Sequence, residues 1–171
     1  MTFIGNYKEL QFSSLLSQIE QSLELDLYFV AIMTSLVIPD IGGAIDSENG
    51  KTEKNKYINW YDKYVKSKYI NSRPLTGSEC YYLRCSMLHQ GITKNSNNPE
   101  NISFMSFPQS NSSVNPFSLD NHLGLIIEPK TFCNNIIFGA YDWLDTVHNN
   151  FLFNKNMENF ITLYSLLFTN L

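Results

Sequence analysis

The chain has 171 residues, 43 % of them hydrophobic and 14 % aromatic, which is enough for a well-buried core and excludes a disordered chain. Its net charge is −4, so the chain lacks the strongly basic composition typical of proteins that bind the phosphates of duplex nucleic acid. We expect residues 1–171 to form a single domain.

Three features predict a cytoplasmic protein. The cysteines, Cys80, Cys85 and Cys133, are odd in number and form no CxxC pair, which argues against a disulfide framework or a thiolate zinc site. The first residues lack the basic and apolar pattern of a signal peptide, and the longest apolar run, 27–38, is too short for a membrane span. We therefore expect no membrane contact, no metal and no cofactor.

The first half of the chain predicts three helices. Apolar residues at steps of three and four predict a first helix from about Tyr7 to Ile38, which Pro39 and the following glycines would end. A second helix is expected at about 54–69. Its aromatic stripe fits core packing better than a platform for stacking bases, and consists of Tyr57, Trp60, Tyr61 and Tyr64.

Local signals delimit the third helix. Thr76 and Glu79 have the spacing of a capping box, and Gly91 is placed to be the C-terminal cap. The stretch "LRCSMLHQG", residues 83–91, is therefore expected to be the C-terminal half of a helix of about fifteen residues.

The second half of the chain begins with a change in composition. We expect residues 92–128 to form loops and a two-stranded antiparallel hairpin, with strands at "ISFMSF" and "HLGLIIE". A fourth helix should begin near Pro129, "HNNFLFN" should break it, and a fifth should run from about Lys155 to the end. The chain thus predicts a mainly α bundle of about five helices, with a short β-hairpin between the third and fourth.

Arg84 and His89 form a pair that could carry chemistry. Five positions on a helix correspond to about 140° of rotation and about 7.5 Å of rise, so both side chains reach one cleft only if the helix end tightens or unwinds. Arginine suits phosphate oxygens, and histidine transfers protons near neutral pH. A histidine that removes the proton of a ribose 2′-OH, with an arginine on the phosphate, suffices for RNA cleavage without a metal. The alternative is an exposed arginine and a histidine hydrogen-bonded at the helix end.

"YYLRCSMLHQG", residues 81–91, resembles the signature of the HEPN superfamily, which is an arginine, four to six residues, and a histidine near the end of a helix in an all-α bundle. The resemblance implies a homodimer in which two motifs meet in one cleft. It also implies a metal-independent ribonuclease of toxin–antitoxin, phage-defence or RNA-processing systems, with an antitoxin or the product of a neighbouring gene as partner. Arg84 and His89 would be catalytic, and Tyr82, Cys85 and Gln90 would be neighbours in the cleft.

One residue departs from the pattern. Active HEPN members usually carry a polar residue, most often Asn, directly after the arginine, and this chain has Cys85. The alternative function is therefore an inactive HEPN-like dimer that binds a protein or a nucleotide, and a third is a purely structural helical module. A metal site at His122 or His148, and a Cys85–His89 nucleophile, are weaker hypotheses because no metal-binding motif accompanies the histidines and an inert cysteine is commoner.

Overall fold

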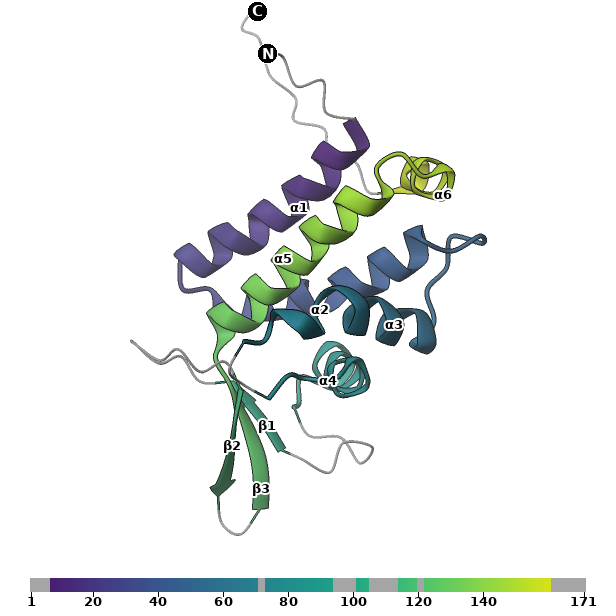
Figure 1. Ribbon diagram of the computed structural model, residues 1–171. Helices are drawn as coiled ribbons and strands as arrows, with labels where there is room; N and C mark the ends of the chain where they lie inside the picture. Colours follow the sequence, from purple (N-terminus) through teal and green to yellow (C-terminus); the bar gives the residue numbers. More distant parts are fainter. Residues whose placement is uncertain (1–6, 71–72, 94–100, 105–113, 120–121, 161–171) are drawn as a thin grey trace, which may run out of the picture.

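The computed structural model describes residues 7–70, 73–93, 101–104, 114–119 and 122–160 (Figure 1). Within these ranges the protein is mainly helical, as expected. The helices are α1 (Tyr7–Glu24), α2 (Tyr28–Ile45), α3 (Lys54–Tyr64), α4 (Gly77–Gln90), α5 (Pro129–Val147) and α6 (Phe151–Asn156), with 3₁₀ turns η1 (Lys66–Lys68) and η2 (Met157–Asn159). The strands are β1 (Asn101–Phe104), β2 (Val114–Leu119) and β3 (His122–Ile127).

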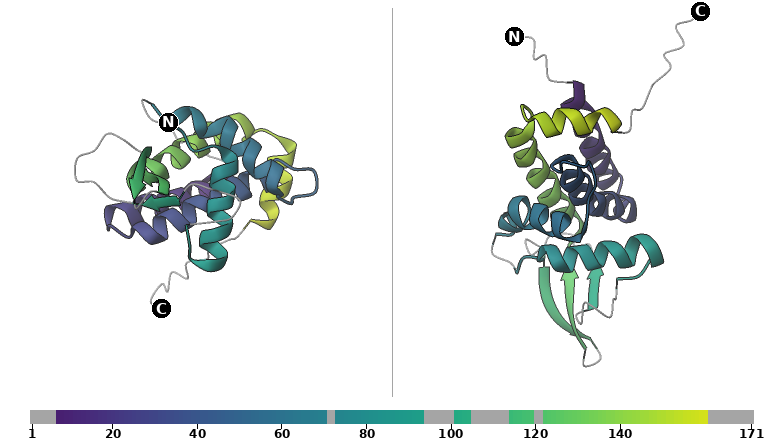
Figure 2. Two further views of the ribbon diagram at one scale, coloured as in Figure 1. Left: turned by 90° about the horizontal axis from the view of Figure 1, so that it is seen from below. Right: turned by 90° about the vertical axis from the view of Figure 1, so that its right-hand side faces the viewer.

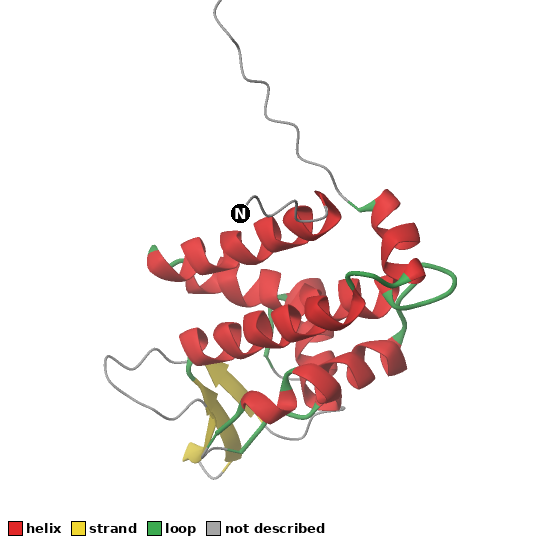
Figure 3. Cartoon of the chain, turned by 45° about the horizontal axis from the view of Figure 1, so that its top comes forward, coloured by secondary structure: helices red, strands yellow, loops and turns green. Residues whose placement is uncertain are grey.

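The helices form one packed body with the small sheet at one end (Figure 3). Helix α2 packs against α1, α3, α4 and α5, so it is the central element of the bundle. Helix α4 lies between the rest of the helices and the strands (Figure 2). The helix that carries the Arg–His motif therefore sits at the junction of the two parts of the fold.

The predicted first helix is wrong in length, because it is two helices. The chain breaks between α1 and α2 at residues 25–27, where Asp26 has a φ of +55°. Pro39 does not end α2 but lies buried inside it. Gly42 does not make a turn either, since a Cβ atom there would lie 2.2 Å from Nε1 of Trp60. That glycine allows α2 and α3 to approach closely.

The aromatic stripe on α3 is core, as predicted: Tyr57, Trp60, Tyr61 and Tyr64 are all buried. The helix is shorter than expected, ending at Tyr64, and η1 replaces its last turn. The predicted ends of α4 are confirmed. Thr76 and Glu79 form the reciprocal capping box, and Gly91 adopts a φ of +68° as the cap.

Replacing Thr76 with alanine is expected to lower the free energy of unfolding by about 1 kcal/mol, because the backbone N–H of Glu79 loses its acceptor. Urea unfolding followed by circular dichroism measures the change. Thr34→Ala is the matched control, since the Thr34 hydroxyl donates to the Val30 carbonyl of its own helix and caps no helix end. Equal stability of Thr76→Ala and the wild type would contradict the cap's contribution.

The excursion between α4 and α5 differs from the predicted two-stranded hairpin. It is a three-stranded sheet of order β1–β3–β2. The two predicted strands, β1 and β3, are parallel neighbours, with Ile102 opposite Leu125. The antiparallel hairpin is made by β2 and β3, with Val114 opposite Ile127. The second half of "ISFMSF", 105–107, lies outside the described residues.

The C-terminal prediction was right about the start of α5 and wrong about α6. Pro129 is the first residue of α5, and the Glu128 carboxylate accepts hydrogen bonds from the backbone N–H groups of Lys130 and Thr131. The break after α5 is confined to 148–150, and α6 begins at Phe151 rather than at Lys155. Residues 161–171 lie outside the described residues, so the predicted extension of the last helix to the end of the chain is not covered.

Helix α2 is long and apolar enough to cross a membrane, by length and composition alone, and 56 % of it is buried inside the bundle. That is weak evidence for a span, because the central helix of a soluble protein satisfies the same criterion.

Candidate functional site

Arg84 is held in place by a carboxylate from another helix. Its Nε donates a hydrogen bond to Oδ2 of Asp40 at 2.7 Å, and the side chains are 23 % and 11 % exposed. Asp40 follows the buried Pro39 inside α2, so the continuation of that helix places the carboxylate beneath α4. The ion pair occupies the Nε edge of the guanidinium, which is the edge nearer the backbone.

The charges of this pair are set by burial and by mutual attraction. Burial raises the pKa of the Asp40 carboxyl, and the Arg84 charge offsets only part of that effect. Burial acts to lower the pKa of Arg84, but the charge of Asp40 and hydrogen bonds to Asp40 and Cys85 outweigh it and leave the pKa raised. The guanidinium is therefore a permanent cation.

His89 lies in the last turn of α4 and is exposed. No hydrogen bond or ion pair joins it to Arg84 or to another part of the chain that the structure describes. Gly91 caps the helix in the ordinary way, its N–H bonding to the Met87 carbonyl at 3.0 Å, so the helix end does not unwind. One copy of the chain therefore does not bring Arg84 and His89 together by distorting the helix.

The predicted neighbours fall into two groups. Cys85 is partly buried beside Arg84, with Sγ 3.9 Å from Nη1. Tyr82 is partly buried and accepts a hydrogen bond from Nζ of Lys54 at 2.6 Å. Gln90 is exposed, like His89 beside it. Tyr82 and Cys85 are thus partly buried, with Tyr82 beside Lys54 and Cys85 beside Arg84, and Gln90 shares the exposed helix end with His89.

Three residues at this site were missed from the sequence: Asp40, Lys54 and Tyr81. Asp40 stands in "IPDIGG", which reads as the end of a helix, so no local signal marks it as a partner of Arg84. The pKa of Tyr81 is raised, first by burial and then by a hydrogen bond with the Cys85 thiol. Lys54 opens α3 in a run of polar residues that resembles any solvated helix start.

Other cysteines and histidines do not extend the site. Cys80 and Cys133 are buried in the core, and burial raises the pKa of both thiols to about 12. The Nδ1 atom of His148 lies 3.3 Å from the Leu144 carbonyl oxygen of its own helix. Among the residues described, no group of three or more His, Cys, Asp or Glu side chains could hold a metal ion.

Three hollows mark the described surface. One of about 310 Å³ lies between α1 and α5 beside Lys130, and one of about 210 Å³ lies between α2 and α3 beside Trp60. A third of about 340 Å³ lies between α1 and α2 beside Met33. Arg84 and His89 line none of these three.

The fold and site together define a small, mainly helical protein with an anchored arginine and an exposed histidine on one helix. No protein-family model, no curated protein and no solved structure matches the chain. The HEPN form of the bundle therefore stays a prediction that rests on the motif in α4.

Proposed function

We propose that this protein is a cytoplasmic, HEPN-like endoribonuclease that cleaves single-stranded or looped RNA without a metal ion, in a toxin–antitoxin or phage-defence setting. The observation that carries the proposal is the anchoring of Arg84. Asp40 takes the Nε edge of the guanidinium, and the terminal amino groups, of which Nη1 has only a long contact of 3.9 Å with Cys85 Sγ, can still donate hydrogen bonds to phosphate oxygens. An arginine held in this way can stabilise the negative charge that develops on the phosphoryl oxygens in the transition state.

The reaction requires two proton transfers. One imidazole removes the proton of the ribose 2′-OH, whose oxygen attacks the adjacent phosphorus. The bond from phosphorus to the 5′-oxygen breaks, and a second imidazole protonates that oxygen. The products are a 2′,3′-cyclic phosphate and a 5′-hydroxyl end.

A homodimer would supply the second imidazole. His89 is exposed at the end of α4. Within one copy of the chain, the undistorted helix keeps His89 apart from Arg84. If the α4 helices of two copies meet, His89 of each copy can lie across from Arg84 of the other. The proposal therefore has two copies sharing one cleft.

Cleavage of a mixed RNA substrate in EDTA tests the proposal. Arg84→Ala is expected to cut the rate about 100-fold or more, by loss of charge stabilisation, and His89→Ala by a similar factor, by loss of proton transfer. The matched controls are Arg73→Ala, at the other arginine, and His148→Ala, and both should cleave like the wild type. Each variant is first shown to be folded by circular dichroism.

Two results would overturn the proposal: an inert wild type, or unchanged cleavage by both motif variants. Mixed dimers of Arg84→Ala with His89→Ala test the shared cleft. They keep one Arg84 and one His89, so they should stay inactive if the shared cleft needs the imidazoles of both copies, and regained activity would show that a single Arg84–His89 pair is enough.

The second candidate is an inactive HEPN-like dimer that binds a protein or a nucleotide. The observation that favours it is again at Arg84, where the carboxylate of Asp40 offsets the positive charge and Cys85 stands in place of the usual polar residue. A stable complex with the product of a neighbouring gene, together with no RNA cleavage, would decide for this function.

A further inference from the structure

A second cation, Lys54, lies near Cys85, the neighbour of Arg84. Lys54 is the first residue of α3, and its Nζ lies 4.5 Å from the centroid of the Tyr82 ring and 5.9 Å from that of Tyr81. The two rings meet edge to face at 5.8 Å. An ammonium group and two aromatic rings are thus gathered where α3 begins and α4 passes.

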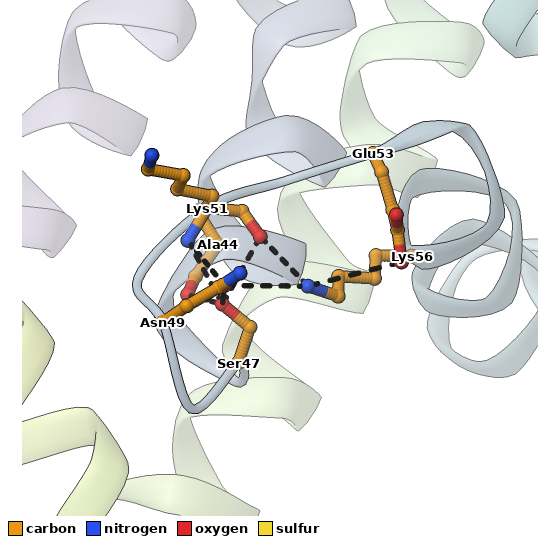
Figure 4. Close-up of polar contacts among 6 residues, drawn as sticks. All are labelled: Ala44, Ser47, Asn49, Lys51, Glu53 and Lys56. Carbon is orange, nitrogen blue, oxygen red and sulfur yellow. Dashed lines mark hydrogen bonds and ion pairs between the residues drawn. The ribbon is translucent and has the colours of Figure 1, made fainter.

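The loop that precedes α3 is held by its own polar contacts (Figure 4). The Ser47 hydroxyl donates a hydrogen bond to the Ala44 carbonyl at 2.7 Å and accepts one from the Lys51 backbone N–H at 2.9 Å. The ammonium group of Lys56 bonds to the Lys51 carbonyl at 3.0 Å, which ties the loop to the first turns of α3. The start of α3, and with it Lys54, therefore has a defined place.

The charge of Lys54 is not offset by a carboxylate in the described parts of the chain. The nearest acid in sequence, Glu53, pairs with Lys56 at 3.9 Å instead. Lys54 is exposed, and its hydrogen bond to Tyr82 raises its pKa, so it stays a cation. Lys54 can therefore still attract an anion such as a phosphate group.

Lys54 and Arg84 are linked through one thiol. The Sγ atom of Cys85 lies 3.9 Å from Nη1 of Arg84. The same thiol helps to raise the pKa of Tyr81 and of Lys54, so it lies near both side chains. Arg84 and Lys54 thus both lie near Cys85, and the ring of Tyr82 lies beside Lys54. Alternation of cations and aromatic rings on an open surface is the usual way to hold a single strand, because phosphates take the cations and bases stack on the rings.

We propose that Lys54 and Tyr82 form a nucleotide subsite next to Arg84, which binds the nucleotide adjoining the scissile phosphate. The Lys54 ammonium takes the neighbouring phosphate, and the Tyr82 ring, released from Lys54, stacks on the base. The inference rests on the proposed function for the identity of the ligand, RNA, but needs binding only and no cleavage.

Binding of a short fluorescent 2′-O-methyl oligonucleotide tests the subsite. The methyl group blocks the attacking oxygen, so anisotropy reports affinity without cleavage. Lys54→Gln should weaken binding about tenfold at low salt, and make the slope of log affinity against log salt shallower by about 0.7. Tyr82→Leu should weaken binding about tenfold, whereas Tyr82→Phe, which keeps the ring, should bind like the wild type.

Lys66→Gln is the control for charge, because Lys66 is an exposed lysine in η1, outside the site. Circular dichroism and thermal unfolding establish that each variant is folded. If Lys54→Gln and Lys66→Gln are equally mild while Arg84→Ala weakens binding, the subsite is wrong and the proposed function stands. If the wild type binds no oligonucleotide and cleaves no RNA, the proposed function fails, and the subsite with it.

Discussion

Replacing Trp143 with alanine is expected to lower the free energy of unfolding by about 3–5 kcal/mol, a large share of a small domain's stability. The indole is fully buried in α5. Its ring centroid lies 5.0 Å from that of Phe12, 6.0 Å from Trp60 and 5.9 Å from Phe153, which belong to three other helices. Truncation therefore removes the contacts that join α1, α3 and α6 to α5.

Urea unfolding of matched variants measures this effect. Trp143→Phe should recover much of the loss, because a smaller ring still fills part of the space. Phe138→Ala is the control on the same helix, since Phe138 is 56 % exposed and its loss should change stability by about 0.5 kcal/mol or less. If Trp143→Ala and Phe138→Ala are equally stable, Trp143 is not the centre of the core.

Elements with local signals were predicted well from the sequence. Thr76, Gly91 and Pro129 mark helix ends through their own backbone preferences, and the structure has α4 and α5 beginning or ending at these positions. Helix faces were predicted for the same kind of reason. In α1 and in α5, apolar residues recur at steps of three and four, which predicts one buried face for each helix. Phe12 of α1 and Trp143 of α5 belong to these two faces, and both are buried.

Elements that depend on packing were not predicted. Pro39 and Gly42 are helix breakers by propensity, but burial of α2 and the close contact with Trp60 outweigh that preference. The break at Asp26 falls in a stretch whose apolar spacing continues without interruption. The parallel pairing of β1 with β3 depends on a connection through β2, whose sequence "VNPFSL" contains a proline that is atypical of strands.

The residues of the candidate site likewise fall into those that the local sequence predicts and those that depend on packing. Arg84 and His89 are recognisable because a spacing within one helix is a property of the sequence. Asp40 and Lys54 come from other helices, and their place beside α4 follows from how α2 and α3 pack. Sequence reasoning could thus find the residues of the motif but not those that position them or add charge beside them.

Replacing Asp40 with alanine is expected to destabilise the protein by about 1–3 kcal/mol, because Arg84 loses its partner in a mostly buried place. Asp40→Asn should be milder, since the amide oxygen still accepts from Nε and no charge is buried. If the proposed function holds, RNA cleavage should fall about 10- to 100-fold in Asp40→Ala through loss of the guanidinium's orientation, and less in Asp40→Asn. Asp145→Asn, at an exposed position of α5, is the control and should match the wild type.

The pH dependence of stability distinguishes a buried carboxylate from a neutral partner at position 40. The pKa of Asp40 in the folded protein is raised above its ordinary value of 3.8, so the folded state holds this proton more tightly than the unfolded state. The contribution of Asp40 is therefore most favourable below pH 3.8 and is lost as pH rises through the folded pKa. Relative to Asp40→Asn, the wild type should become less stable as pH increases over that window, as measured by urea unfolding of both proteins at each pH. A difference that is constant with pH would show that Arg84 cancels the effect of burial on the pKa of Asp40, and a change in the opposite sense would show that Arg84 outweighs it; either result contradicts the raised pKa.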